Sequence, residues 1–168
     1  MNKKIRCSTF LLLCLLMGYA GATMAQGKGG TKPVITQAFA AKEIRPGETW
    51  KIYLNASDPN GDMKNIFAVV YQPGVGEYPM SVIRITEENQ KVLSGYLYLV
   101  TSGPWKVLEF VNINLTIWIQ DKSGNFSEPA IFALSFRSRA SQEAPPQGIF
   151  KEQELGAIMV KLKSSPRG

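Results

Sequence analysis

Histidine is absent from this 168-residue sequence. Without an imidazole the chain lacks the usual general base near neutral pH, and it cannot form a Ser-His-Asp or Cys-His catalytic arrangement. Zinc, copper and haem sites built on His or Cys are also excluded from the mature chain, because both cysteines lie in the first 25 residues, which we expect to be cleaved. Carboxylates, lysine, tyrosine and oxygen-ligated metals remain as the chemistry open to this chain.

Cysteine occurs only as Cys7 and Cys14, both within the first 25 residues. This stretch has a basic segment at 2–6, an apolar run at 10–17 and small residues up to Ala25. That order is typical of a secretory signal peptide, and the apolar run is too short to cross a bilayer. We therefore expect residues 1–25 to be cleaved and the protein to be exported, to the periplasm or to the extracellular side of the cell surface. The mature chain would then contain no disulfide, no thiolate site and no transmembrane segment.

Positive charge is not concentrated in the mature chain. Loss of residues 1–25 lowers the formal net charge from +6 to +3, with 16 basic against 13 acidic side chains. The Lys and Arg residues are scattered, so we expect no nucleic-acid partner. Most Glu residues fall in predicted turns or tails and not in the facing pairs that glycosidases use. We expect no enzymatic activity and no catalytic residue.

Short β-rich runs separated by turn signals fill residues 33–137. Their spacing is typical of an all-β sandwich. In the second run Trp50, Ile52 and Leu54 alternate with polar residues, which predicts one buried face. The predicted strands are Val34–Ala40, Thr49–Ala56, Asn65–Gln72, Met80–Thr86, Lys91–Thr101, Asn112–Asp121 and Ala130–Phe136.

The chain on either side of residues 33–137 differs in composition. Gly-rich residues 26–32 predict a flexible linker, and residues 138–148, with Pro145 and Pro146, predict a second one. Residues 149–168 form an amphipathic C-terminal segment. Within it, apolar residues at helical spacing predict a short helix over Phe150–Lys163; they are Leu155, Ile158, Met159 and Leu162.

Two turn motifs stand beside the predicted strands. One is Asn55-Ala-Ser-Asp-Pro-Asn-Gly-Asp62, and the other is Ile117-Trp-Ile-Gln-Asp-Lys-Ser-Gly-Asn-Phe-Ser127. Together they resemble turns of bacterial immunoglobulin-like and cadherin-like domains. The resemblance covers residues 33–137 and implies a single immunoglobulin-like antiparallel β-sandwich of about seven strands. It concerns the fold and not an activity.

The first motif also contains candidate calcium ligands. Asp58, Asn60 and Asp62 place oxygen atoms at alternate positions, as calcium loops do, and Asp121 is a further carboxylate. The resemblance to cadherin-like domains implies calcium as well, although those domains bind it between neighbouring domains. The alternative interpretation is an ordinary turn without a metal. Apart from calcium, no cofactor is expected.

An outward-facing aromatic cluster is the candidate binding surface. If the apolar positions of Asn112–Asp121 face the core, Trp118 points outward. The resemblance to immunoglobulin-like domains implies that the third predicted strand is its neighbour, with Phe67, Val69 and Tyr71 pointing outward beside it. Such a cluster needs a cover: the C-terminal helix, a partner protein or a stacked sugar. The sequence thus predicts a non-catalytic binding or structural module of the bacterial envelope that holds an envelope or extracellular protein. Calcium-dependent adhesion or assembly, and carbohydrate binding, are the alternatives.

Overall fold

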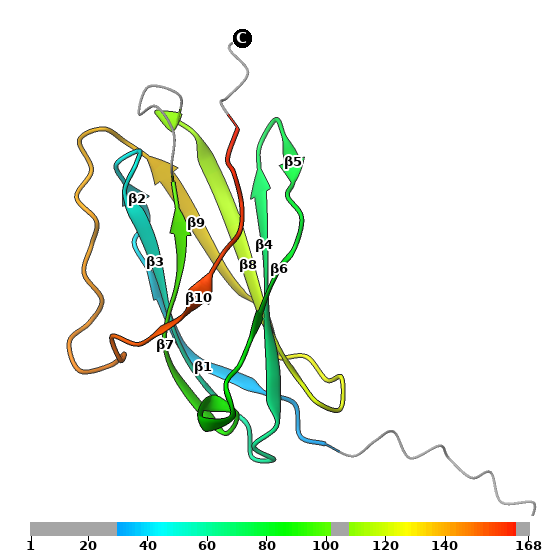
Figure 1. Ribbon diagram of the computed structural model, residues 1–168. Coiled ribbons are helices and arrows are strands. Elements are labelled where there is room, and N and C mark those ends of the chain that lie inside the picture. The colour runs from blue at the N-terminus through cyan, green and yellow to red at the C-terminus, as the bar shows by residue number, and fades with distance from the viewer. Residues whose placement is uncertain (1–29, 102–107, 164–168) are drawn as a thin grey trace, which may run out of the picture.

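The computed structural model describes residues 30–101 and 108–163, which form two β-sheets packed face to face (Figure 1). The first sheet has the order β1-β3-β7-β10, and the second has the order β2-β9-β8-β4-β5, with β6 also paired to β4. The first sheet consists of β1 (Val34–Ala40), β3 (Thr49–Ser57), β7 (Val92–Val100) and β10 (Glu154–Ala157). The second consists of β2 (Glu43–Ile44), β4 (Met63–Gln72), β5 (Gly76–Glu77), β6 (Ser81–Arg84), β8 (Asn112–Asp121) and β9 (Ala130–Phe136).

All seven predicted strands are present, so the all-β sandwich is confirmed. The bounds of β1, β8 and β9 are the predicted ones, and the others differ by a few residues at their ends. A 3-10 turn, η1 (Glu87–Asn89), separates β6 from β7. The predicted signal peptide at residues 1–25 lies outside the described residues, as do parts of both predicted tails.

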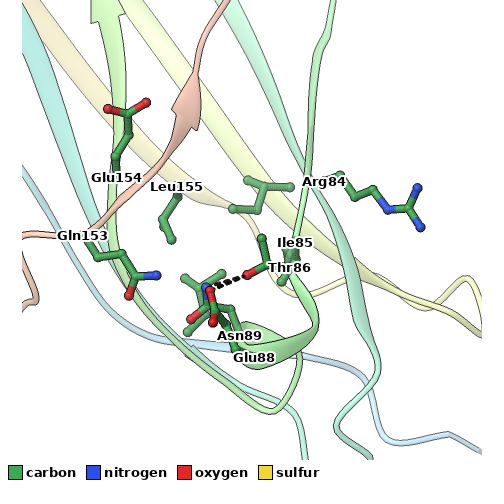
Figure 2. Close-up of a pocket in the computed structure, with 10 residues that line it drawn as sticks. Arg84, Ile85, Thr86, Glu88, Asn89, Gln153, Glu154 and Leu155 are labelled. Carbon is green, nitrogen blue, oxygen red and sulfur yellow. Dashed lines mark hydrogen bonds between the residues drawn. The ribbon is translucent and has the colours of Figure 1, made fainter.

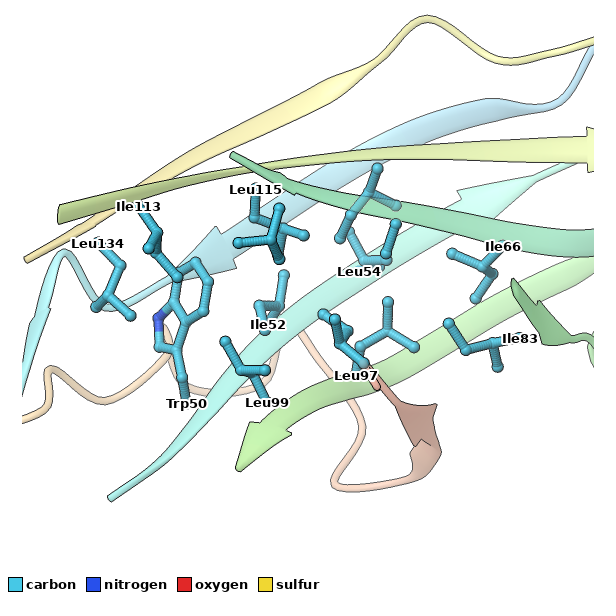
Figure 3. Packing of buried hydrophobic residues seen from close by; sticks show 14 of the residues in the cluster. Trp50, Ile52, Leu54, Ile66, Ile83, Leu97, Leu99, Ile113, Leu115 and Leu134 are labelled. Carbon is cyan, nitrogen blue, oxygen red and sulfur yellow. The ribbon is translucent and has the colours of Figure 1, made fainter. Parts of the chain in front are cut away.

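The core lies between the sheets and follows the predicted alternation. Trp50, Ile52 and Leu54 of β3 are fully buried against side chains from the facing sheet, such as Ile113 and Leu115 (Figure 3). The Trp50 indole N–H donates to the carbonyl oxygen of Ala41 at 2.8 Å, which satisfies a polar group that burial would otherwise penalise.

The strand order matches the immunoglobulin-like arrangement, except that a different segment of the chain fills the place of one strand. In that arrangement four strands in the order A-B-E-D face the sheet that contains C, F and G. Here β1, β3 and β7 take the places of A, B and E, whereas β4, β8 and β9 take those of C, F and G. The place of strand D beside β7 is filled by β10, which comes from the C-terminal end of the chain and pairs parallel to β7.

The predicted C-terminal helix is wrong. The segment from Phe150 to Lys163 is extended, contains β10 and has no helical turn. Ile158 is buried and Leu162 half-buried, but Met159, which the helical pattern placed with them, is 79% exposed. A vacant edge of β7 offers this segment backbone partners, and such tertiary pairing outweighs a weak helical pattern that includes Gly156.

Candidate functional site

The outer face of the six-stranded sheet brings the predicted aromatic cluster together. The β4–β8 register places Phe67 opposite Trp118, and the β4–β6 register places Val82 on the other side of Phe67. The ring of Phe126, from the loop after β8, lies 5.7 Å from that of Phe67. We call this surface the aromatic face; it comprises Phe67, Val69, Tyr71, Val82, Trp118, Phe126 and Ile131.

Much of the aromatic face remains accessible. Tyr71, Val82, Phe126 and Ile131 are 44–68% exposed, whereas Phe67 and Trp118 are half-buried by their neighbours. Contiguous apolar surface of this kind is typical of interaction sites on soluble proteins.

Charge is absent from the paired rows of this surface. The outward positions that pair across β4, β8 and β9 hold aromatic, aliphatic and uncharged polar side chains in the described part of the chain. Two charged residues lie at the margin of the face: Arg84, opposite Asn65, and Glu77 of β5, opposite Tyr71. Aromatic enrichment with depletion of charge distinguishes the centre of a protein interface from other surface.

The predicted cover for the aromatic face lies on the opposite side of the molecule. The C-terminal segment crosses the outer face of the four-stranded sheet, where the ring of Phe150 lies 5.6 Å from that of Tyr53. Glu152 accepts a hydrogen bond from the Tyr53 hydroxyl at 2.8 Å and forms an ion pair with Lys51 at 2.9 Å. Tyr53 is buried as a result, so the aromatic residues of this sheet have an intramolecular cover. Cover of the aromatic face by a C-terminal helix is therefore contradicted.

Three carboxylates meet where β3 and β8 end. Oxygen atoms of Asp58, Asp62 and Asp121 lie within 4.8 Å of one another. Asp58 accepts the backbone N–H of Asn60 at 3.0 Å, and Asp121 accepts the side-chain and backbone N–H groups of Asn125 at 2.7 and 2.8 Å. Asp58 and Asp121 are each 1% exposed. We call Asp58, Asp62 and Asp121 the carboxylate cluster; the Asn60 side chain is exposed, and this residue takes part through its backbone.

The neighbouring carboxylates disfavour the charged form of Asp62, and the positive charge of Lys122 only partly opposes them. A hydrogen bond with Asp58 raises the pKa of Asp62, and burial together with the charges of Asp58 and Asp121 raises it further. The Oδ1 atom of Asp62 is buried and has no hydrogen-bond partner. An all-oxygen donor set with one unused buried oxygen fits a hard divalent cation such as calcium.

Sequence patterns did not assign Val82, Phe126 and Ile131 to the aromatic face. Their membership depends on the pairing of β6 with β4, of β9 with β8, and on the path of the loop after β8. The alternation of Ile131 with Phe132 and Leu134 predicts that Ile131 points outward. It does not predict which residues of other strands lie beside Ile131.

Comparison with known proteins gives no family for this chain. No family model matches, and no curated protein matches. Among solved structures the chain is similar to the PKD domain of an M14-like peptidase from Thermoplasmatales archaeon SCGC AB-540-F20, at 12% identity and a TM-score of 0.36. The match covers 65% of this chain and 99% of that domain. The fold assignment therefore depends on the sheet order described above.

No helix among the described residues is long and apolar enough to cross a membrane.

Proposed function

We propose that this protein is an exported, non-catalytic binding module of the bacterial envelope that holds a protein partner on its aromatic face. The observation that supports the proposal most is the uncharged row Val82–Phe67–Trp118 across three strands, left open by a C-terminal segment that covers the other sheet. The signal-peptide pattern supports export.

A protein ligand fits the composition of this surface. Rigid aromatic side chains fixed on strands lose little conformational entropy on binding, and Trp is enriched among residues that dominate interface energies. Trp118 lies on the central strand β8 and is flanked by Phe67, so it is the expected anchor. Its replacement by Ala should cost about 2 kcal/mol of binding free energy, or roughly a thirtyfold loss of affinity.

Site-specific photocrosslinking in the native host tests the proposal. A benzophenone amino acid replaces Val82 on the aromatic face, or Thr36 on β1 of the other sheet as a matched exposed control. We expect a defined protein adduct from position 82, weakened by Trp118→Ala and absent from position 36. Equal adducts at both positions, or an adduct insensitive to Trp118→Ala, would contradict a partner on this face.

Two other outcomes separate the remaining functions. Retention of the wild-type protein on glycans, lost with Trp118→Ala and accompanied by no protein adduct, would identify a carbohydrate-binding module. Specific hydrolytic turnover that disappears when one carboxylate is changed would identify an enzyme and end the proposal.

Calcium-dependent adhesion or assembly is a second candidate, supported by the carboxylate cluster. Bound Ca²⁺ would offset the repulsion among Asp58, Asp62 and Asp121 and engage the unpartnered Asp62 oxygen. Asp121 also fixes Asn125, the residue before Phe126. A cation at the cluster would therefore stabilise the loop that holds Phe126 against Phe67.

Calorimetric titration with Ca²⁺ tests this second candidate. Calcium at about a hundred times its dissociation constant should stabilise the fold by about 2.7 kcal/mol. The effect should disappear in Asp62→Asn and persist in Glu128→Gln, which removes an exposed carboxylate outside the cluster. Absence of both heat and a rise in melting temperature at millimolar calcium would exclude it.

A further inference from the structure

The position beside β7 is occupied by a segment that is remote in the sequence. Between β4 and β7, the local strand β6 pairs with β4 in the other sheet. This leaves an edge on β7 that the C-terminal segment fills, with Gly156 opposite Leu97 and Ala157 opposite Tyr98. We call the channel between β7 and β6 the acceptor groove, with Gly95 and Tyr98 on one wall and Ser81 and Ile83 on the other.

The acceptor groove is shaped for this segment at two glycines. A Cβ atom on Gly95 would collide with the carbonyl oxygen of Gln153 and lie 2.9 Å from Cγ of Leu155. Gly156 has a φ of +149°, and a Cβ there would lie 2.7 Å from Cγ2 of Ile83. Neither position has room for a side chain while the segment occupies the groove.

The backbone of the segment hydrogen-bonds to the backbone of β7 and to one side chain of β6. Gln153 accepts the N–H of Tyr96, and Ile158 donates to the carbonyl of Tyr98, each at 2.8 Å. Met159 donates its N–H to the Ser81 hydroxyl at 2.9 Å. These partners are fixed by the groove, so any chain with the same segment would make the same bonds.

The segment is tethered loosely and leaves space at its point of entry. Residues 141–149 lack regular structure and are exposed except for Pro145, which is half-buried. Residues 141–148 separate Ala140, whose carbonyl accepts from the Arg45 side chain, from Ile149, whose carbonyl accepts from the Asn55 side chain. Nine residue steps span at most about 30 Å. A cavity of about 120 Å³ lies here between the segment, β6 and η1. Figure 2 shows the Gln153 and Leu155 side chains directed toward this space, whereas that of Glu154 points away from it.

We propose that the acceptor groove also takes the C-terminal segment of a second copy of this chain, giving a reciprocal strand-exchanged dimer. No described strand follows β10, so the segment can leave the groove without displacing another described strand. Each groove makes identical contacts with either copy's segment, and only the tether changes its path. The segment of the same chain is favoured in dilute solution by its effective concentration, about millimolar, so exchange requires comparable protein concentrations. This inference is independent of the proposed partner on the aromatic face.

Cysteine pairing tests the proposal in the full chain with Cys7 and Cys14 replaced by Ser. Tyr98→Cys and Ala157→Cys place thiols at paired positions of β7 and β10. Neighbouring strands lie about 4.8 Å apart, which is within the usual Cα range for a disulfide. The double variant should close an intramolecular disulfide in dilute solution. Failure to close would overturn the account, because β10 would not lie beside β7.

The two single variants are then unfolded, mixed, refolded together near millimolar concentration, diluted and oxidised. We expect a disulfide-linked heterodimer that is several-fold more abundant than the product of a control mixture of Thr36→Cys with Ala157→Cys. A yield no higher than the control, while the double variant closes its own disulfide, would refute strand exchange.

Discussion

Replacement of Gly95 by Ala tests the position of the C-terminal strand. Glycine inside a strand usually destabilises it, so the substitution alone should stabilise the fold by about 0.5–1 kcal/mol. At Gly95, however, the new methyl group collides with the Gln153 carbonyl, which is backbone and cannot rotate away, and crowds Leu155. Overpacking of this kind costs about 1–3 kcal/mol, and displacement of β10 sacrifices hydrogen bonds worth about 1 kcal/mol each.

The net expectation for Gly95→Ala is a loss of about 2 kcal/mol, or a melting temperature lower by about 6–8 °C. Hydrogen exchange should accelerate at the amides of Tyr96 and Ile158, which bond across the β7–β10 pair. Val92→Ala, at an exposed position of the same strand, is the control and should change stability by less than about 0.5 kcal/mol. A higher melting temperature for Gly95→Ala would refute the reasoning, since it would mean that nothing packs against this residue.

Three further substitutions test the core and the charged groups. Trp50→Phe should cost about 2–3 kcal/mol in urea unfolding, because it leaves a cavity and an unpaired Ala41 carbonyl; an unchanged midpoint would contradict burial of the indole. Without calcium, the raised pKa of Asp62 makes the fold gain stability as pH falls from neutral through that pKa, so Asp62→Asn should melt higher at neutral pH and lose this gain. The lowered pKa of Glu152, from its hydrogen bond and ion pair with Lys51, stabilises the fold until pH falls through that pKa. Glu152→Gln should therefore flatten the acid side of a melting-temperature profile and, because the pair is exposed, cost less than about 1 kcal/mol; an unaltered acid side would argue against this contact.

The strands that carry the core were predictable because their alternation is local. In β8 the inward aliphatic residues alternate with Asn114, Thr116 and Trp118, which point outward, and the turn at 121–125 marks the end of the strand. The same phase placed Trp118 on the outer face, and pairing of the third predicted strand with the sixth brought it beside Phe67. When a strand has one buried and one exposed face, the two-residue period of its sequence predicts which side chains point into the core.

The C-terminal strand was not predicted because two periodicities overlap there. Leu155, Ile158 and Leu162 satisfy a helical spacing, but Ile158, Val160 and Leu162 also alternate with exposed residues, as in a strand. Local sequence cannot choose between the two patterns, because the choice depends on a vacant edge formed some sixty residues earlier.

The carboxylate cluster was predictable only in part. Asp58 and Asp62 share one turn, so their proximity is a local property, whereas the approach of Asp121 depends on the end of β8 lying beside the start of β4. The sequence could not show that the Asn60 side chain stays exposed.

Oxidative footprinting of the protein in its native host tests the proposed partner on the aromatic face most directly. Hydroxyl radicals are generated on intact cells and, in parallel, on the purified protein. We expect Phe67, Trp118 and Phe126 to be oxidised less on intact cells than in the purified protein, while Met159, an exposed residue of the C-terminal segment, is oxidised equally in both samples. Equal oxidation of Trp118 in the two samples would contradict the account, since the aromatic face would then meet only water in its native setting.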